Sequence, residues 1–418
     1  MPCEIHARAL AIAAANSENG AMNFHPRAPE VGTADVAGIV AALEPAFDFA
    51  GGDYRALHAN SDATVFQSPA WLDALHRDVA PAFGATQATL TVRDQDGRLM
   101  MVLPLVRRRQ RGATILEFAD FGLCDYNGAI CDLDDAALLD LDATLPQRVT
   151  RAMPRHDLMT LTKMTREDPL LRRLFPEAAR AQMRFSAYPA RLTRNWQAWR
   201  ETALSQGFRR DLGMKRRRLE RLGTIEFVRL SDPEQIARAF GTLRALRSAR
   251  LKSIGGHDVL ADEAIFTFYR RMAVEGAQKG FARTECLTVS GELVAVQFGL
   301  VQRGTHSMLM LGADIERFGR TSPGILMLES SVRAAIEDGD QVYDFTIGDH
   351  PYKQQFGAQA IPLYEWHRGQ TLYGRATVPA ITLMREAKRA LKPWLMPETG
   401  GRAKAAASEA AKANQGKQ

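Results

Sequence analysis

The sequence predicts a mixed α/β protein, with α+β mixed sheets, built as two similar halves. The chain has 418 residues, and a domain with a single hydrophobic core is usually shorter than this, so two cores are expected. Two stretches, Thr89–Val106 and Cys286–Val301, repeat one β-hairpin pattern around turns at Asp96-Gly97 and Ser290-Gly291. In both halves, further strands and amphipathic helices surround the hairpin. Internal duplication is the simplest explanation of the repeat.

The first half alternates helical and strand patterns. A short helix is predicted from Pro69 to Asp78, followed by the hairpin and an apolar strand from Thr114 to Phe118. The run Cys124-Asp125-Tyr126-Asn127-Gly128 is typical of a turn, and helical spacing returns from Ala136 to Met153.

The second half contains a strand–loop–helix–strand unit after its hairpin. Apolar periodicity predicts the following elements in chain order: helices 233–250 and 262–278, the hairpin 283–302, a strand 306–313, a loop 314–322, a helix 323–338 and a strand 342–347. A further hairpin completes this half. A basic amphipathic helix is predicted from residue 377 to about 395, before a tail rich in Ala, Lys and Gly.

A basic segment separates the halves. Ten Arg or Lys residues and three acidic residues lie between Arg191 and Leu222, a local balance of +7 against +6 for the whole chain. Residues 208–222 carry an apolar stripe at helical spacing, with arginines on the other faces. Such a helix has its charged side either in solvent, as a linker, or on a phosphate.

These patterns divide the chain into five parts. We expect a loose N-terminal tail over 1–35, a first domain over 36–185, a basic helical linker over 186–225, a second domain over 226–376, and a basic helix with a disordered tail over 377–418.

Composition indicates a cytoplasmic protein. Hydrophobic residues make up 46% and charged residues 24%, as in ordinary soluble proteins, and no run approaches the roughly 20 apolar residues of a membrane span. The four cysteines have neither CxxC spacing nor a disulfide-framework pattern, so reduced buried thiols are expected. The histidines form no cluster with metal-ligand spacing, and no metal is predicted.

A loop with anion-binding character precedes the helix that begins at Pro323. Ser322 is a favoured N-cap residue, and Pro323 suits the first helical position. Gly319 and Gly324 let backbone N–H groups approach a ligand at the positive end of the helix dipole. Arg317 and Arg320 add charge suited to a diphosphate. Simple helix capping is an alternative explanation for the same residues.

Two motifs carry a family resemblance. They are Arg320-Thr321-Ser322-Pro323-Gly324 and Tyr343-Asp344-Phe345-Thr346-Ile347-Gly348-Asp349-His350-Pro351-Tyr352-Lys353-Gln354-Gln355-Phe356-Gly357, with Leu103-Pro104-Leu105 and Asp125-Tyr126 matching in the first half. The chain resembles the GNAT superfamily, whose pyrophosphate loop lies between the fourth strand and the next helix. It is more closely similar to the CelD-like acetyltransferases of cellulose biosynthesis, which are related to Fem-type peptidyltransferases.

The resemblance extends from about Phe66 to Arg375 and implies two tandem GNAT-like acyl-CoA N-acyltransferase folds. It implies an acyl-CoA co-substrate, with acetyl-CoA first, held by Arg317, Gly319, Arg320, Ser322 and Gly324. The GNAT loop usually has closely spaced glycines, whereas Pro323 occupies its crowded end here. The first half has no Ser-Pro-Gly equivalent, so a structural or acceptor-positioning role is expected for it.

Three residues of the second motif are candidate catalytic groups. Asp344 alternates with Tyr343 and Phe345 along the strand, so it faces the opposite side and is placed to take a proton from the acceptor. Tyr352 is placed to return a proton to the leaving thiolate, and Lys353 to bind a substrate anion or stabilise the oxyanion. A capping role for Asp344 and a half-buried position for Tyr352 are the structural alternatives, and His350 is expected at the surface.

Arg247, Arg250 and Asp349 are the candidate acceptor-binding residues. Arg247 and Arg250 lie at helical spacing with Arg244, on a face that is in solvent or borders the cleft. On a cleft they would attract an acidic acceptor such as a sugar phosphate or a nucleotide-linked glycan precursor.

The leading expectation is an acyltransferase that moves acetyl from coenzyme A to an amine or hydroxyl of a sugar, cell-envelope or exopolysaccharide precursor. The polysaccharide link is implied by the resemblance alone. One alternative is a Fem-type transferase that uses aminoacyl-tRNA, with Arg209 to Arg221 on the RNA. The other is a non-catalytic accessory protein associated with polysaccharide-synthesis machinery.

Overall fold

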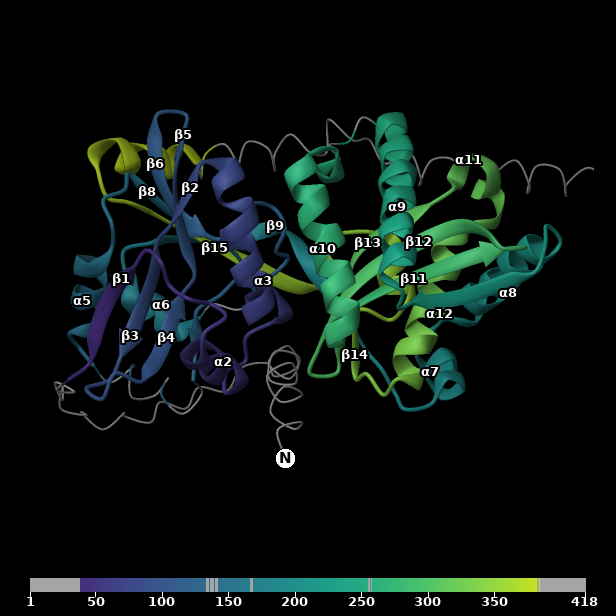
Figure 1. Ribbon diagram of the computed structural model, residues 1–418, viewed down its shortest axis with the longest axis horizontal. Helices are drawn as coiled ribbons and strands as arrows, with labels where there is room; N and C mark the ends of the chain where they lie inside the picture. Colours follow the sequence, from purple (N-terminus) through teal and green to yellow (C-terminus); the bar gives the residue numbers. More distant parts are fainter. Residues whose placement is uncertain are drawn as a thin grey trace, which may run out of the picture.

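The computed structural model describes residues 38–381 and 383, except 133–134, 136–138, 140–141, 166–167, 255 and 257. The expected N-terminal tail and most of the basic C-terminal segment lie outside the described residues. The described chain is a mixed α/β structure, as the sequence predicts, with strands from both halves running through its middle (Figure 1).

A large mixed sheet connects the two halves. In the described part of the chain it has eleven strands in the order β10-β11-β12-β13-β14-β9-β15-β8-β6-β5-β2. Their bounds in chain order are β2 (Ala85–Gln87), β5 (Leu105–Gln110), β6 (Ala113–Phe118), β8 (Leu158–Met164), β9 (Ala179–Arg191), β10 (Ile225–Leu230), β11 (Ala282–Val289), β12 (Glu292–Gln302), β13 (Thr305–Ala313), β14 (Val342–Ile347) and β15 (Ile361–Gly369). A second sheet in the first half has the order β1 (Val40–Glu44), β3 (Thr89–Arg93), β4 (Leu99–Leu103) and β7 (Ile130–Cys131).

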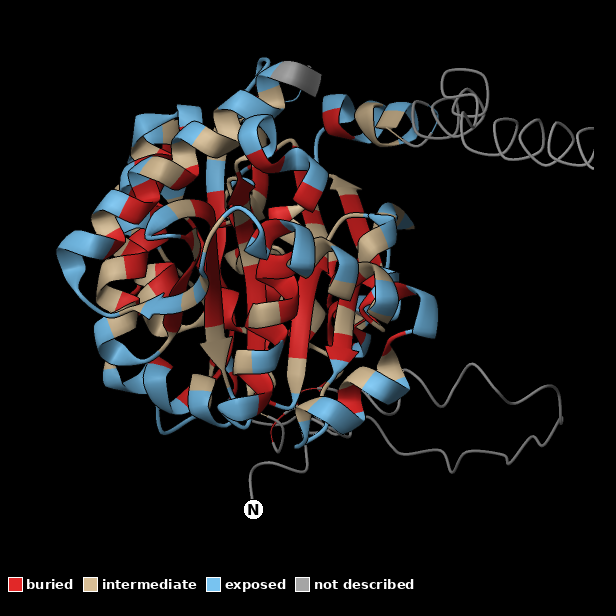
Figure 2. Ribbon diagram, turned by 90° about the vertical axis from the view of Figure 1, so that its right-hand side faces the viewer, coloured by how far each residue is buried: buried red, intermediate tan, exposed pale blue. Residues whose placement is uncertain are grey.

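Helices pack around these sheets, with buried residues concentrated on the strands and exposed residues on the outer helix faces (Figure 2). Their bounds are α2 (Gly52–Ala59), α3 (Pro69–Ala74), α5 (Leu145–Ala152), α6 (Pro169–Leu174), α7 (Trp196–Ala203), α8 (Gln206–Glu220), α9 (Pro233–Ile254), α10 (Glu263–Lys279), α11 (Ile315–Phe318), α12 (Pro323–Glu337) and α13 (Pro351–Gln355). None of them, within the described ranges, is long and apolar enough to cross a membrane.

The strand pairing repeats between the halves. β6 and β8 are parallel neighbours in the first half, as β13 and β14 are in the second. The second-last residue of β8, Lys163, has φ 61°, and the second-last residue of β14, Thr346, has φ 56°. Left-handed backbone is uncommon for a residue other than glycine. Its recurrence at matching strand positions supports the internal duplication that the hairpins predict.

Proline causes one departure from the predicted elements. The return strand expected from Leu99 to Val106 is divided at Pro104 into β4 and β5, which belong to different sheets. Proline lacks a backbone N–H donor and is therefore disfavoured inside a strand. The corresponding strand of the second half, β12, runs from Glu292 to Gln302 without a break.

The segment predicted to be a basic linker is part of a hydrophobic core in the second half of the chain, which we call the second core. Helices α7 and α8 bury Trp199, Phe208, Leu212 and Leu219 there, beside residues of α12 and β14. The later strand β15 returns to the first half, where it lies between β9 and β8. The chain therefore crosses between the halves twice, and the exact domain boundaries stay a prediction.

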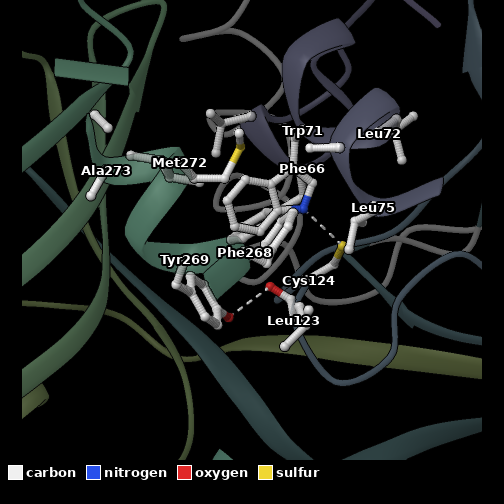
Figure 3. Packing of buried hydrophobic residues seen from close by; sticks show 14 of the residues in the cluster. Phe66, Trp71, Leu72, Leu75, Leu123, Cys124, Phe268, Tyr269, Met272 and Ala273 are labelled. Atoms are coloured by element: carbon white, nitrogen blue, oxygen red, sulfur yellow. Dashed lines mark hydrogen bonds between the residues drawn. The ribbon is translucent and has the colours of Figure 1, made fainter. Parts of the chain in front are cut away.

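One core cluster includes residues of both halves. Trp71 of α3 lies edge-on to Phe268 and Tyr269 of α10, with ring centroids 4.9 and 5.9 Å apart. Its indole N–H donates to the Cys124 thiol at 3.3 Å, and the Tyr269 hydroxyl donates to the carbonyl of Leu123 at 3.4 Å (Figure 3). These contacts fix the loop around residue 124 against the second half.

Trp71→Ala should destabilise both halves together. Removing a fully buried tryptophan leaves a cavity and costs about 3–5 kcal/mol. Urea unfolding followed by fluorescence and by circular dichroism should show one shared transition at lower urea for the variant. Leu222→Ala, at a side chain that is 57% exposed, is the control and should leave the midpoint nearly unchanged. Two separate transitions in the wild-type protein would contradict a shared core.

Candidate active site

A cavity of about 220 Å³ lies between the two halves. The first half lines it with Thr64, Gln67, Tyr126 and Asn127 among others, and the second half with Gln302, Thr305, Ser307, Val342 and Asp344. Three carboxylates, those of Asp62, Asp168 and Asp344, lie along its wall, and no Lys, Arg or His is among the lining residues that the structure describes. The cavity is therefore acidic and partly apolar.

Asp344 lies where two parallel strands separate. β13 and β14 pair at only three positions, and Ser307 with Asp344 is the last of them. Beyond this pair, Thr346 adopts left-handed backbone, and its hydroxyl donates to the Met308 carbonyl at 3.0 Å. The Thr346 N–H donates to the Asp344 carboxylate at 2.8 Å. Burial raises the pKa of Asp344, as expected of a carboxyl that is 5% exposed.

The first half brings Asp125 and Tyr126 to the same place. Burial, with a smaller contribution from the charge of Asp344, raises the pKa of Asp125 to about 6, while nearby Lys163 opposes the change. The carboxyl of Asp344 is close to the buried Tyr126 hydroxyl without forming a well-aligned hydrogen bond in this structure. Burial and that charge both raise the pKa of Tyr126, so the phenol stays protonated.

Lys353 holds the C-terminal end of β14 through hydrogen bonds to its backbone. Its ammonium group is buried and donates to the carbonyls of Thr346 at 3.1 Å and Ile347 at 2.8 Å. Burial lowers its pKa to about 8, while the charges of Asp344 and Asp125 oppose the change. Two of its three donors are occupied by backbone, so its clearest role in this structure is to hold the separated strand and the carboxylates.

Tyr352 is near the site but does not line the cavity. Its ring is stacked on His350 with centroids 5.7 Å apart and packs against the second core. Burial raises its pKa. Its use as the acid for the leaving group stays a prediction, and Tyr126 is the phenol that the structure places on the cavity wall.

The predicted donor loop forms, with a different start to its helix. Ser322 occupies the N-cap position of α12 in left-handed backbone, φ 53° and ψ 58°, and its side chain makes no capping hydrogen bond. Its carbonyl accepts from the N–H groups of Ile325 and Leu326 instead. Within the described structure the Gly324 N–H has no backbone acceptor outside the helix. This N–H remains the donor suited to an anion.

The charged and glycine residues of the loop differ in their availability. Arg317 is exposed and forms a two-pronged ion pair with Glu292, so a diphosphate would have to displace that carboxylate. Arg320 is exposed in a short 3₁₀ turn, with no ion pair to another described residue. Gly319 has ordinary right-handed backbone, so its conformation does not require glycine.

The three candidate acceptor-binding residues do not meet at the cavity. Arg247 lies between α9 and α10 near Asp258 and Tyr269, and burial lowers its pKa. Arg250 is exposed, and its charge acts on Tyr352 and His350. Asp349 accepts hydrogen bonds from the Ser186 N–H at 3.1 Å and the Tyr188 hydroxyl at 3.0 Å, which fix β9 beside β14.

Sequence reasoning did not assign Asp125 and Tyr126 to the site. Their place in the family pattern was the only sequence signal for these two residues. Periodicity does not reveal a contact between residues 126 and 344. Cys124, Cys131 and Cys286 are free thiols. Across the described ranges, no three His, Cys, Asp or Glu residues are grouped so that they could hold a metal ion.

Comparisons with known proteins agree with this architecture. Residues 206–354 match the family model of the acetyltransferase (GNAT) domain, so the second half contains a GNAT-type domain. A structure of FemX superposes with a TM-score of 0.52 at 12% identity, over 75% of this chain and 94% of that chain. A conserved protein of unknown function from Bacteroides thetaiotaomicron gives 0.50 at 12% identity, over 78% of this chain and 99% of that chain. These two likenesses show the fold alone, and no curated protein matches the sequence.

Asp125→Asn should change how stability depends on pH. The folded-state pKa of about 6 is above the unfolded value, so protonated Asp125 favours folding at low pH and this contribution is lost as pH rises through about 6. Between about pH 4 and 7, the Tm of the wild type should therefore fall relative to that of the variant. Asp96→Asn, in an exposed turn, controls for loss of a carboxylate. A wild-type Tm that rises relative to the variant over this range would contradict the burial of Asp125.

Proposed function

We propose that the protein is an acyltransferase that moves an acyl group, acetyl first, from coenzyme A to an amine or hydroxyl bound in the cavity between the halves. One observation carries this proposal. Asp344 lies both on the cavity wall and at the last paired position of β13 and β14. A carboxylate that can act as a base therefore lies at the opening between the two strands. A thioester carbonyl entering that opening would be next to a nucleophile in the cavity.

The donor side is supported by the start of α12. The Gly324 N–H, the positive end of the helix dipole and exposed Arg320 are suited to the diphosphate of coenzyme A. A Cβ at position 324 would lie 3.4 Å from that of Ala313 and 3.5 Å from Leu311, an ordinary contact. An alanine would therefore also fit at position 324, so the glycine is not what leaves room for a ligand there.

In the proposed reaction, the acceptor nitrogen or oxygen attacks the thioester carbonyl directly. Asp344 takes the proton that the acceptor loses, and its raised pKa brings it closer to neutral pH than an ordinary carboxyl. Tyr126, kept protonated, donates a hydrogen bond or a proton on the same wall. The tetrahedral intermediate then releases the thiolate of coenzyme A.

A cysteine acyl-enzyme is disfavoured by burial. Burial raises the pKa values of the Cys131 and Cys286 thiols to about 12, and it also raises that of the Cys124 thiol well above its usual value. A thiol with such a pKa gives almost no thiolate near pH 7. Direct transfer is therefore the mechanism that these residues support.

The acidic lining favours an amine over an anionic group at the reacting end of the acceptor. Carboxylates attract an ammonium group, and Asp344 can remove its proton before attack. The CelD-like branch and a sugar or cell-envelope acceptor rest on the motif resemblance and remain part of the proposal, as does reaction in the cytoplasm.

Gly324→Glu should weaken binding of acetyl-CoA by about tenfold or more, about 1.4 kcal/mol, because it adds a negative charge at the helix start where the diphosphate would bind. Gly324→Ala is the matched control and should bind like the wild type, since its Cβ makes only ordinary contacts. Calorimetric titration measures both. Equal affinities for Glu and Ala variants would refute this placement of the diphosphate.

The same titration separates the alternative donor. Binding of aminoacyl-tRNA through the arginines of α8 should weaken steeply with salt, whereas acetyl-CoA binding should change little. Binding of aminoacyl-tRNA alone would favour the Fem-type alternative. Binding of neither donor would favour the non-catalytic accessory role.

Asp344→Asn should lower kcat by about a hundredfold to ten-thousandfold, the range for loss of a general base, and leave acetyl-CoA affinity unchanged. The acid limb of the pH profile should also disappear. Glu285→Gln removes another buried carboxylate of the second half that does not line the cavity, and it is the control. Full activity of a folded Asp344→Asn variant would overturn the assigned base.

A further inference from the structure

A second concave surface, which we call the arginine groove, adjoins the cavity. It has a volume of about 350 Å³ and is formed by the end of β9, the turn between β12 and β13, and the segment before β14. Its residues are Arg191, Leu192, Thr193, Arg194, Arg303, Thr305, Gly339, Asp340, Gln341 and Val342. Thr305 and Val342 also line the cavity, so the two spaces are neighbours.

The charges of the groove are unbalanced. Arg191 and Arg194 are exposed and form no ion pair or side-chain hydrogen bond with another described residue. Asp340, the carboxylate in the lining, is already paired with Arg283. Two guanidinium groups are thus available to an anion on a concave surface, and guanidinium suits the geometry of phosphate oxygens.

Arg303 makes the third side of the groove rigid. Its guanidinium donates to the carbonyls of Ser61 at 2.6 Å and Ala63 at 3.3 Å in the first half. It also bonds to the carbonyls of His58 and Ala59 at the end of α2. The turn that carries Arg303 is therefore fastened to the other half, and the groove keeps its shape.

We propose that the arginine groove binds a phosphate group of the acceptor whose nucleophile occupies the adjoining cavity. This inference rests on the proposed function, since it names the substrate class for the same site. Val342 and Asp344 are two residues apart on one strand face, roughly 7 Å. The amine or hydroxyl of such an acceptor is therefore separated from its phosphate by a distance of about this order.

The groove revises where the anion of an acidic acceptor would bind. The sequence placed it on Arg247 and Arg250, but neither lines the cavity or the groove. Arg191 and Arg194 lie at the beginning of the basic segment instead. The acidic cavity and the basic groove together select a molecule that carries both kinds of group, and they disfavour one with two anionic ends.

The test is protection of individual arginines from phenylglyoxal by glycerol 3-phosphate, read by peptide mass spectrometry on the full chain. At a concentration ten times Kd, Arg191 and Arg194 should react about tenfold more slowly than in chloride at equal ionic strength. Arg217 and Arg218 of α8 are the internal controls and should react at unchanged rates. Equal rates for Arg191 and Arg194 with and without glycerol 3-phosphate would overturn the proposal.

Two further arms identify the source of the phosphate and separate this inference from the proposed function. Vesicles of phosphatidylcholine with phosphatidylglycerol should protect both arginines only if the phosphate belongs to a lipid headgroup, whereas protection by glycerol 3-phosphate alone indicates a soluble acceptor. Arg191→Ala/Arg194→Ala should abolish the thermal shift caused by glycerol 3-phosphate and keep that caused by acetyl-CoA. Loss of both shifts would mean that the groove belongs to the donor site and would overturn its assignment to the acceptor.

Discussion

The separation of β13 from β14 beyond the Ser307–Asp344 pair is the constraint on which the candidate site depends. Two parallel strands normally continue to bond, so their divergence must be stabilised by other contacts. Thr346 supplies several of them, because its N–H binds Asp344, its hydroxyl binds the Met308 carbonyl, and its own carbonyl accepts from Lys353. The left-handed backbone of Thr346 costs free energy, of order 1–3 kcal/mol, which these bonds offset.

The first half completes this site, although its sequence has no equivalent of the Ser-Pro-Gly motif. In its parallel pair, Lys163 near the end of β8 donates to the Asp120 carboxylate at 3.0 Å and to the Cys124 carbonyl at 2.7 Å, both in the segment after β6. Those contacts hold the chain that carries Asp125 and Tyr126 across to Asp344. In the proposed function, both copies of the duplicated fold keep the same strand geometry, but the second copy holds the donor and the first shapes the acceptor cavity.

Local signals explain which features were predictable. β14 spans Val342–Ile347 and α12 begins at Pro323, as the alternation and the Ser-Pro-Gly sequence predict. Ser322 occupies the predicted N-cap position, but its backbone is left-handed and its side chain makes no capping hydrogen bond. Contacts between distant segments left no periodic trace, so the approach of Tyr126 to Asp344 and the groove formed by Arg191 and Arg303 required the structure.

The protonation states of the buried carboxylates connect them to the proposed chemistry. The charge of Asp344 adds to the effect of burial in raising the pKa of Asp125, so ionised Asp344 favours a protonated Asp125. Lys353 limits the rise in the pKa of both carboxyls, because its positive charge favours their ionised forms. Burial lowers the pKa of Lys353 itself to about 8. An ammonium acceptor entering the cavity adds a second positive charge and helps Asp344 to be ionised when the acceptor arrives. The base is thus ionised when the molecule whose proton it must take is bound, and a neutral hydroxyl acceptor would lack this assistance.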